Sequence, residues 1–350
     1  MKEKKWLLLG GAAVGLAAVI LVLLGNPANM GFCIACFIRD IAGSLGRHKA
    51  AVVQYMRPEI IGLVVGAFVI ALAKKDFAPK GGSSPVLRFM LGFGVMVGAL
   101  IFLGCPLRMA LRIAGGDLNA VVGLGGFIAG ILVGIVFLKR GFSLGRTQRQ
   151  GKVEGVAMTG LNVAFLVVLL AFPTLLIFSE SGPASQKAPI FAALAAGLIV
   201  GAIAQRTRLC MVGGLRDIVL FKDATLVMGF IAVIVVALVG NIAMGKFALG
   251  FTGQPVAHTE HLWNFLGMTV VGLGSILLGG CPLRQLILTG EGNSDSAVAV
   301  LGMAVGAAFC HNFGLASSGA GTTPAGRVAC IIVLVAMLVI AFFNTKKADA

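Results

Sequence analysis

The pentapeptide Gly-Cys-Pro-Leu-Arg occurs twice in this chain, at residues 104–108 and 280–284, and each copy places a thiol where a helix should begin. Proline fixes φ near the helical value and needs no hydrogen-bond acceptor, so Cys105 and Cys281 are predicted helix N-caps. The free N–H groups and the positive end of the helix dipole at such a position favour anions, and they favour a thiolate over a thiol. Each copy could therefore hold an anion or present a reactive sulfur.

A second cysteine pattern also recurs. Residues 32–40 align with residues 209–217, so that Cys33 matches Cys210 at a spacing of 177 residues, while the two Gly-Cys-Pro-Leu-Arg cysteines lie 176 residues apart. Two motifs that recur in the same order at one spacing predict two homologous halves. We interpret Cys33 and Cys210 as lining a path.

Each copy of this second pattern ends in an Arg-Asp pair, Arg39-Asp40 in the first and Arg216-Asp217 in the second. We interpret both pairs as neutralised charges at the membrane edge. Ionisable residues near a membrane core are functional candidates, but an adjacent Arg and Asp equally suit a role in fixing topology, so both roles stay open.

The composition predicts a polytopic membrane protein. The 350 residues are 58% hydrophobic and 12% charged, and the mean hydropathy is +1.01, which a water-soluble domain of this length would not tolerate. The net charge of +15 comes from Lys and Arg scattered over short loops. That pattern indicates membrane topology rather than nucleic-acid binding.

Apolar segments long enough to span a bilayer occur ten times, and shorter apolar runs occur four times. The predicted spans lie near residues 6–24, 57–73, 88–104, 119–138, 155–178, 190–206, 224–245, 262–280, 296–314 and 326–343. The shorter runs lie at residues 31–45, 105–114, 208–220 and 281–290. Because these four are too short to cross and too apolar for ordinary loops, we interpret them as re-entrant half-helices.

The distribution of Lys and Arg predicts the orientation. With the N-terminus in the cytoplasm, 19 of these residues fall on the cytoplasmic side and 9 outside, which favours two cytoplasmic termini. The main disagreement is the basic cluster at residues 47–57, which falls on the outer side.

These elements together predict an all-α polytopic membrane protein with two inverted repeats, about ten transmembrane helices, four short re-entrant half-helices and an hourglass shape. An odd number of crossings separates the repeats, so the second should be inverted. Half-helices from 33 and 105 then enter from outside, and those from 210 and 281 from the cytoplasm. The expected units are residues 1–150 for the first repeat, 151–185 for a linker helix, 186–325 for the second repeat, and 326–350 for an extra helix and tail.

Further residues near the cysteines have alternative interpretations. Arg108 and Arg284 could attract an anion, or could extend to the interface or pair with a carboxylate. Cys33 and Cys36 have the spacing of a redox or metal motif, but Gly213 replaces the second thiol in the other half, which disfavours a dithiol role. Cys36, Arg39 and Arg216 are therefore second-tier site candidates.

No cofactor is expected. His258 and His261 lie beside Trp263 and favour an interfacial role over a metal site. Neither a Walker motif, nor a G-x-G-x-x-G fingerprint, nor H-E-x-x-H is present, which disfavours an ATP-driven pump or a nucleotide enzyme. Cys310 and Cys330 are interpreted as packing residues.

The repeated cysteine motifs resemble the YeeE/YedE family of bacterial inner-membrane proteins over nearly the whole chain, and the Gly-Cys-Pro-Leu-Arg copies resemble the YedE branch proposed to carry selenium. The resemblance implies uptake of a thiosulfate-type anion through an hourglass-shaped protein, with Cys33, Cys105 and Cys281 in contact with the ion and Cys210 as the repeat equivalent of Cys33. The thiosulfate branch tends to have small and polar residues, often with a histidine, after the position of Cys105. This chain has Pro-Leu-Arg there, so the cargo stays open between sulfur and selenium.

The sequence thus predicts a transporter rather than an enzyme, embedded in the lipid bilayer of a bacterial inner membrane. It would take up a small inorganic anion or other chalcogen species along the six path residues Cys33, Cys105, Cys210, Cys281, Arg108 and Arg284. The resemblance also implies a cytoplasmic sulfur-carrier partner. The alternatives are a membrane thiol-disulfide oxidoreductase that uses Cys33 and Cys36, and a protein that transfers a persulfide to a cytoplasmic acceptor.

Overall fold

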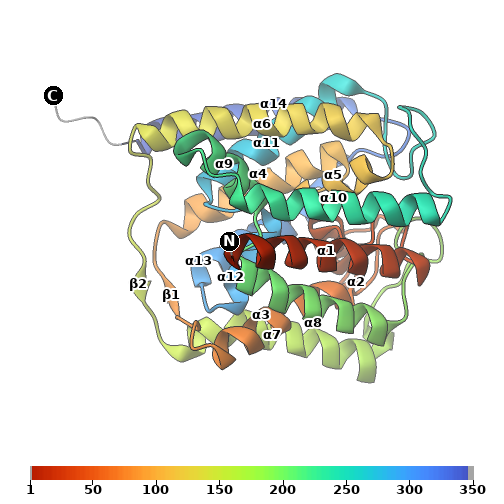
Figure 1. Ribbon diagram of the computed structural model, residues 1–350, viewed down its shortest axis with the longest axis horizontal. Helices are drawn as coiled ribbons and strands as arrows, with labels where there is room; N and C mark the ends of the chain where they lie inside the picture. Colours follow the sequence, from red (N-terminus) through yellow and green to blue (C-terminus); the bar gives the residue numbers. More distant parts are fainter. Residues whose placement is uncertain (1, 346–350) are drawn as a thin grey trace.

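The computed structural model describes residues 2–345, which form fourteen α-helices, one 3-10 turn and a two-stranded ribbon. Figure 1 shows the long helices lying side by side. The helices are α1 (Lys2–Leu23), α2 (Ile34–Ser44), α3 (Pro58–Ala73), α4 (Pro85–Phe102), α5 (Pro106–Ala114), α6 (Leu118–Lys139), α7 (Lys152–Ala171), α8 (Ile190–Thr207), α9 (Met211–Phe221), α10 (Thr225–Ala243), α11 (His261–Leu277), α12 (Pro282–Gly290), α13 (Ser294–Asn312) and α14 (Pro324–Phe343). The turn is η1 (Pro173–Leu175), and β1 (Lys80–Gly81) pairs with β2 (Gln148–Arg149) in antiparallel sense.

The predicted fold class is confirmed. Among the described residues, nine helical segments are long and apolar enough to span a bilayer, and α3 is a shorter apolar helix of 16 residues. The ten predicted spans coincide with the ten long helices, and the four short runs coincide with α2, α5, α9 and α12. Helix bounds differ from the predicted segments by a few residues at their ends.

The same order of six elements stands on both sides of α7: long, short, long, long, short, long. Helices of one set pack against helices of the other. Helix α3 packs on α8 as α10 packs on α1, and α6 packs on α11 as α13 packs on α4. The two sets are therefore interlocked. The boundaries at residues 150, 185 and 325 stay a prediction.

Equivalent helices of the two sets run in opposite directions. A Cβ atom added to Gly10, early in α1, would lie 2.7 Å from the Thr207 methyl carbon at the end of α8. One added to Gly25, just after α1, would lie 2.8 Å from the carbonyl oxygen of Lys187, just before α8. Helices α1 and α8 are thus antiparallel, and contacts of α4 with α11 show the same sense.

Glycines allow the backbones of paired helices to touch. A Cβ atom at Gly66 on α3 would overlap the carbonyl oxygen of Leu198 on α8, and one at Gly201 on α8 would overlap the carbonyl oxygen of Leu63. The same kind of contact joins α4 to α13 through Gly92. Small residues at such crossings permit the close packing that stabilises helix pairs in lipid.

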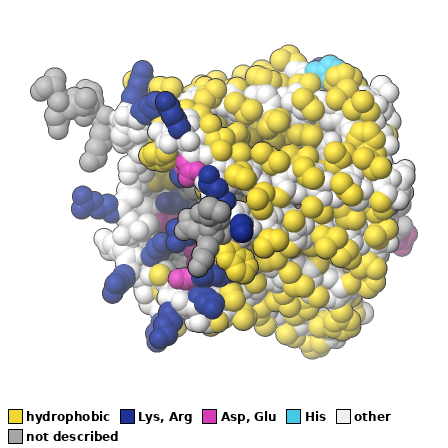
Figure 2. Space-filling model, in the orientation of Figure 1, with side chains coloured by type: hydrophobic (Ala, Val, Ile, Leu, Met, Phe, Trp, Pro, Cys, Tyr) yellow, Lys and Arg dark blue, Asp and Glu magenta, His cyan; other side chains and the backbone are white. Residues whose placement is uncertain are grey.

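Charged side chains gather at one edge of the molecule, where α1 begins and α14 ends, and apolar side chains cover the adjoining face (Figures 1 and 2). Four arginines assigned to the opposite side by sequence, Arg39, Arg57, Arg108 and Arg112, are at most 2% exposed. Because buried arginines do not face a membrane surface, the asymmetry of exposed charge is stronger than 19 to 9. This arrangement favours a cytoplasmic assignment of the basic edge, and that assignment stays a prediction.

Substitution of Gly66 by Ala should destabilise the protein. The new methyl group overlaps the α8 backbone, and overpacking of this kind costs about 1–3 kcal/mol. The matched control is Gly160→Ala on the exposed side of α7, where nothing lies within 4 Å of the added atom, and which should be neutral or stabilising by up to about 1 kcal/mol. The unfolding midpoint of the detergent-solubilised protein measures both. Equal midpoints for the two variants would contradict the close contact.

Candidate functional site

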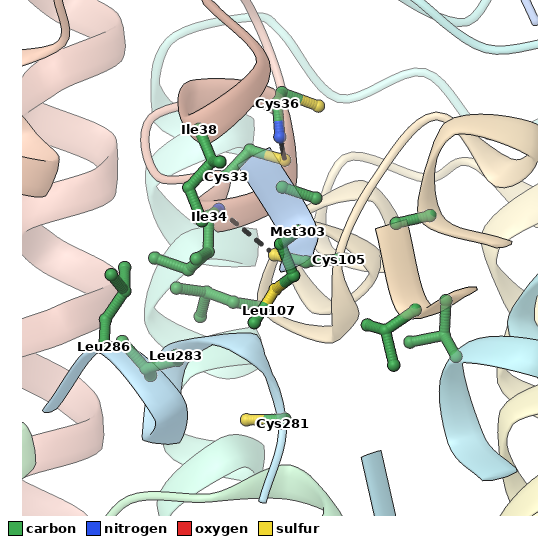
Figure 3. Close-up of a cluster of buried hydrophobic side chains, with 14 of the residues drawn as sticks. Cys33, Ile34, Cys36, Ile38, Cys105, Leu107, Cys281, Leu283, Leu286 and Met303 are labelled. Carbon is green, nitrogen blue, oxygen red and sulfur yellow. Dashed lines mark hydrogen bonds between the residues drawn. The ribbon is translucent and has the colours of Figure 1, made fainter. Parts of the chain in front are cut away.

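Helices α2 and α5 bring their N-termini together at a first pair of cysteines, Cys33 and Cys105 (Figure 3). Cys33 is the N-cap of α2, and its sulfur accepts the Cys36 N–H at 3.3 Å. Cys105 is the N-cap of α5, and its sulfur accepts the Ile34 N–H, the first of α2, at 3.2 Å. Each sulfur therefore occupies a position where helix N–H groups would otherwise be unsatisfied.

Helices α9 and α12 form a second pair with the same arrangement. Cys210 is the N-cap of α9 and accepts the Gly213 N–H at 3.4 Å, and Cys281 is the N-cap of α12. The sulfurs of Cys210 and Cys281 lie 3.9 Å apart, and both cysteines are free. The four cysteines predicted from the repeats are thus brought together in two pairs, 33 with 105 and 210 with 281.

Both pairs belong to one buried apolar cluster. Each of the four cysteines is at most 5% exposed. Figure 3 shows Leu107, Leu283 and Met303 among the side chains that surround Cys105 and Cys281. Leu107 and Leu283 are the leucines of the two Gly-Cys-Pro-Leu-Arg copies, so the repeat supplies the apolar contacts together with the sulfurs.

The repeat-equivalent arginines Arg108 and Arg284 have different surroundings. Arg108 is 0% exposed and donates to backbone carbonyl oxygens, including that of Leu103, that of Val256 at 3.2 Å and that of Pro255 at 3.4 Å. Its Nη1 also lies 3.8 Å from the Cys36 sulfur. The guanidinium thus ties α5 to the loop before α11. Neither interface exposure nor a carboxylate partner accounts for Arg108.

Arg284, in contrast, pairs with Glu291 at 2.9 Å and lines a cavity of about 1210 Å³. The cavity opens at the basic edge of the molecule, and its wall includes residues from α1, α8 and α12. Five cations and four carboxylates line it: Lys74, Lys80, Arg206, Arg208, Arg284, Asp76, Asp217, Asp223 and Glu291. Arg208 stands two residues before Cys210 and Arg284 three residues after Cys281, so the cavity wall includes sequence neighbours of the second cysteine pair.

Asp40 forms a buried ionic cluster with two arginines. It lies 2.7 Å from Arg39 and 2.8 Å from Arg57, and all three side chains are at most 3% exposed. The partnership of Arg39 with Asp40 follows the sequence prediction, whereas Arg57 was assigned to a surface cluster. The equivalent pair, Arg216 with Asp217, is only partly buried, with side chains 35% and 16% exposed.

Sequence analysis also missed a second buried ion pair. Arg112 lies 2.6 Å from Asp117, the N-cap of α6, and both side chains are fully buried. The signal was present, because Arg112 falls in the last turn of a predicted half-helix and Asp117 precedes an apolar span. The pair joins the end of α5 to the start of α6 and so positions Cys105 at the other end of α5.

The second-tier residue Cys36 is buried, and its backbone N–H, not its thiol, is the feature shared with Gly213.

His258 is buried as well and its Nε2 lies 2.8 Å from the Ile101 carbonyl oxygen. Burial lowers the pKa of His258, which keeps the ring neutral. Within residues 2–345 there is no group of three His, Cys, Asp or Glu side chains that could hold a metal ion.

Three comparisons with known proteins bear on this site. Residues 206–345, which include Cys210 and Cys281, match the family model described as sulphur transport. Residues 206–345 of this chain are thus similar to a sulphur-transport family. A protein of Spirochaeta thermophila named thiosulfate transporter TsuA is 31% identical over 126 residues, which are 34% of this chain and 35% of the relative.

A protein of Escherichia coli with the same name is 30% identical over 111 residues, which are 32% of this chain and 31% of the relative. The match spans about a third of the length of each of these relatives. Both relatives are named for thiosulfate.

Substitution of Asp40 by Asn should strongly destabilise the protein, because two buried arginines lose their shared carboxylate. Removal of one partner from a buried ion pair costs about 3–5 kcal/mol. The repeat offers a control, Asp217→Asn, whose partly exposed pair contributes about 0–1 kcal/mol. Yield and unfolding midpoint of the purified variants measure the difference. If Asp217→Asn lowers the unfolding midpoint as much as Asp40→Asn does, the buried ionic cluster does not stabilise the fold more than the partly exposed pair.

Proposed function

We propose that this chain is a membrane transporter that takes up a small sulfur-containing anion of the thiosulfate type along its four N-cap cysteines. The observation that carries the proposal is that four buried half-helix N-termini meet in two pairs, and the N-cap residue of each is a cysteine. The kinship with a sulphur-transport family and the names of the two relatives support it. In this proposal the protein carries an anion across the membrane and is not an enzyme.

The chemistry of the N-caps suits such an anion. Helix N–H groups and the positive end of the dipole stabilise negatively charged oxygens. A thiol is a weak, polarizable donor that can contact a terminal sulfur or selenium. The N–H groups of Ile34 and Cys36 now bond to cysteine sulfurs, and an anion would take over these donors. Because each interaction is weak, the ion can also leave, as conduction requires.

The surroundings of the two cysteine pairs differ, and the difference indicates on which side of the membrane the proposed path is open. At the first pair Arg108 is held by backbone carbonyls of the loop at Pro255 and Val256. At the second pair Arg284 faces the large cavity. With the basic edge in the cytoplasm, this conformation is closed outside and open inside. Cargo would pass from Cys33 and Cys105 to the second pair and then into the cavity.

Two finer proposals follow from the family resemblance. A selenium species would satisfy the same thiol and N–H donors, since selenium is a soft atom like sulfur. A cytoplasmic sulfur-carrier protein would receive the cargo at the mouth of the cavity. The oxidoreductase alternative is not favoured, because Cys33 and Cys36 are both 0% exposed and could not meet the thiol of a partner protein.

Uptake of labelled thiosulfate into cells that lack other importers tests the proposal. Cys105→Ala and Cys281→Ala should each lower uptake about tenfold or more, because a hydrogen bond to a charged group contributes about 1.5–3 kcal/mol. The control Cys330→Ala removes a cysteine that is also buried, but in the unbroken helix α14, and should transport normally. Membrane-protein levels of all variants need to match. Normal uptake by Cys105→Ala would overturn the thiol path.

Cys36→Ala distinguishes transport from dithiol chemistry. Transport should persist, because the Cys36 N–H that reaches Cys33 belongs to the backbone and survives the substitution. Loss of activity in this variant, with Cys105→Ala unaffected, would instead indicate a dithiol enzyme. Competition by selenite in the same assay reports on selenium, and a sulfur adduct on Cys105 after turnover would indicate persulfide transfer.

A further inference from the structure

Glu59 is a carboxyl group that the proposed path does not use. It lies in the first turn of α3 and is 1% exposed. Its Oε1 accepts a hydrogen bond from the Asn26 side-chain amide at 2.8 Å. Its Oε2 has no hydrogen-bond partner within the part of the chain that the structure describes. A buried carboxylate with one unsatisfied oxygen is costly, and protonation of that oxygen removes the cost.

Opposing influences favour the charged form. The N-terminus of α3 and the guanidinium of Arg57, two residues earlier, both stabilise a carboxylate at this position. Burial and the charge of Asp40 act in the other direction. The Tyr55 hydroxyl is a further neighbour. On the side of α8, Gly197 approaches the backbone carbonyl oxygen of Glu59 and carries no charge. The surroundings of Glu59 therefore contain groups that favour its protonated form and groups that favour its ionised form, as a site that binds and releases a proton requires.

Asn26 connects this carboxyl to the first cysteine pair. The amide nitrogen that binds Glu59 also donates to the Gly31 carbonyl oxygen at 3.1 Å, and the amide oxygen accepts the Ala188 N–H at 2.8 Å. Gly31 stands two residues before Cys33, the N-cap of α2. A change at Glu59 is thus transmitted through a single side chain to the segment that positions Cys33.

The charge balance also links Glu59 to an anion. Arg39 and Arg57 contribute two positive charges near the end of this segment, and Asp40 neutralises one. Ionised Glu59 neutralises the other, so its protonation raises the net charge of these four groups by one. An anion at Cys33 and Cys105 would be attracted by that charge, and the low-dielectric interior strengthens the attraction.

A second cavity lies on the side of the molecule opposite the basic edge, close in sequence and contact to the residues that hold Asn26. A cavity of about 440 Å³ is lined by Tyr55, Lys187 and Ala188, among others. Ala188 is the residue whose N–H binds Asn26. The Tyr55 hydroxyl is buried and, among the described residues, has no partner. The unsatisfied hydroxyl of a residue that lines a cavity of this size is a suitable partner for water.

We propose that Glu59 is a proton-binding site and that its protonation favours anion binding at Cys33 and Cys105, so that a proton and the cargo anion are taken up together. The proposal rests on the proposed function. One proton adds to the Glu59 carboxylate and later leaves it, and no electrons are transferred. The accompanying proton offsets part of the charge that a dianion would carry into a negatively charged cell interior.

Thiosulfate uptake into proteoliposomes at a series of pH values tests the coupling. For the wild type, the half-saturating thiosulfate concentration should rise with pH, by up to about tenfold per pH unit, the limit for one linked proton. Glu59→Gln keeps an oxygen for the Asn26 bond and mimics the protonated acid, so its affinity should not vary with pH. The control Glu180→Gln alters an exposed carboxyl and should keep the wild-type dependence. A pH-dependent Glu59→Gln variant, or a pH-independent wild type, would overturn the coupling while leaving transport itself intact.

Two measurements on purified protein in detergent do not depend on transport. Addition of thiosulfate in weakly buffered solution, followed with a pH-sensitive dye, should show proton uptake by the wild type and none by Glu59→Gln. Infrared titration should show a carboxylic-acid band in the wild type that is missing in Glu59→Gln. Identical infrared titrations would overturn the proton site. If the wild type takes up no thiosulfate but the band difference is present, the proton site stands and the proposed function fails.

Discussion

The structure depends on one constraint: backbone N–H groups inside a bilayer must find acceptors within the protein. Four helices of this chain begin in the buried core, and each begins at a cysteine N-cap. The sulfurs of Cys33, Cys105 and Cys210 accept N–H groups of their own helix or of the partner half-helix. The cysteine N-caps that allow helices to begin inside the bilayer are thus also suitable contacts for a soft anion. A thiol sulfur is a weak hydrogen-bond acceptor, so an anion that accepts more strongly can replace it at these N–H groups. An oxygen acceptor, such as a carbonyl group fixed in the fold, would be replaced less readily.

Each cysteine pair lies within one of the two inverted halves, and the inversion places the two pairs on different sides of the molecule. Glycine contacts such as those at Gly66 and Gly201 interlock helices of one half with helices of the other, so the half-helices are held from both sides. The same sequence motif then meets two environments. Arg108 is enclosed by carbonyl oxygens, whereas Arg284 borders the large cavity. In transporters with inverted repeats, an exchange of the environments of the two copies is the geometric basis of alternating access.

Buried charge is concentrated on the side of the first cysteine pair. Arg39, Asp40, Arg57 and Glu59 are all nearly inaccessible, while the equivalent Arg216 and Asp217 are partly exposed. If the chain takes up an anion as proposed, the electrical work of that uptake would give this asymmetry a function. Each negative charge that enters a cell with an interior potential of about −100 mV costs about 2.3 kcal/mol. A positively charged cluster that includes a protonatable group would therefore offset this work best on the side of the proposed path where the anion begins the transfer.

Sequence by itself determined the membrane class, the ten long helices, the four half-helices and the cysteines that begin them. These features depend on local properties: apolar length, helix-start signals such as Cys-Pro, and a repeat spacing that survives in the chain. Only the tertiary structure decided that Cys33 lies with Cys105 and Cys210 with Cys281, that Arg57 joins Arg39 at Asp40, and that Arg108 is enclosed while Arg284 is not. These outcomes depend on which helices cross and how closely their glycines approach, and such contacts between residues far apart in the chain leave no periodic signal in the sequence.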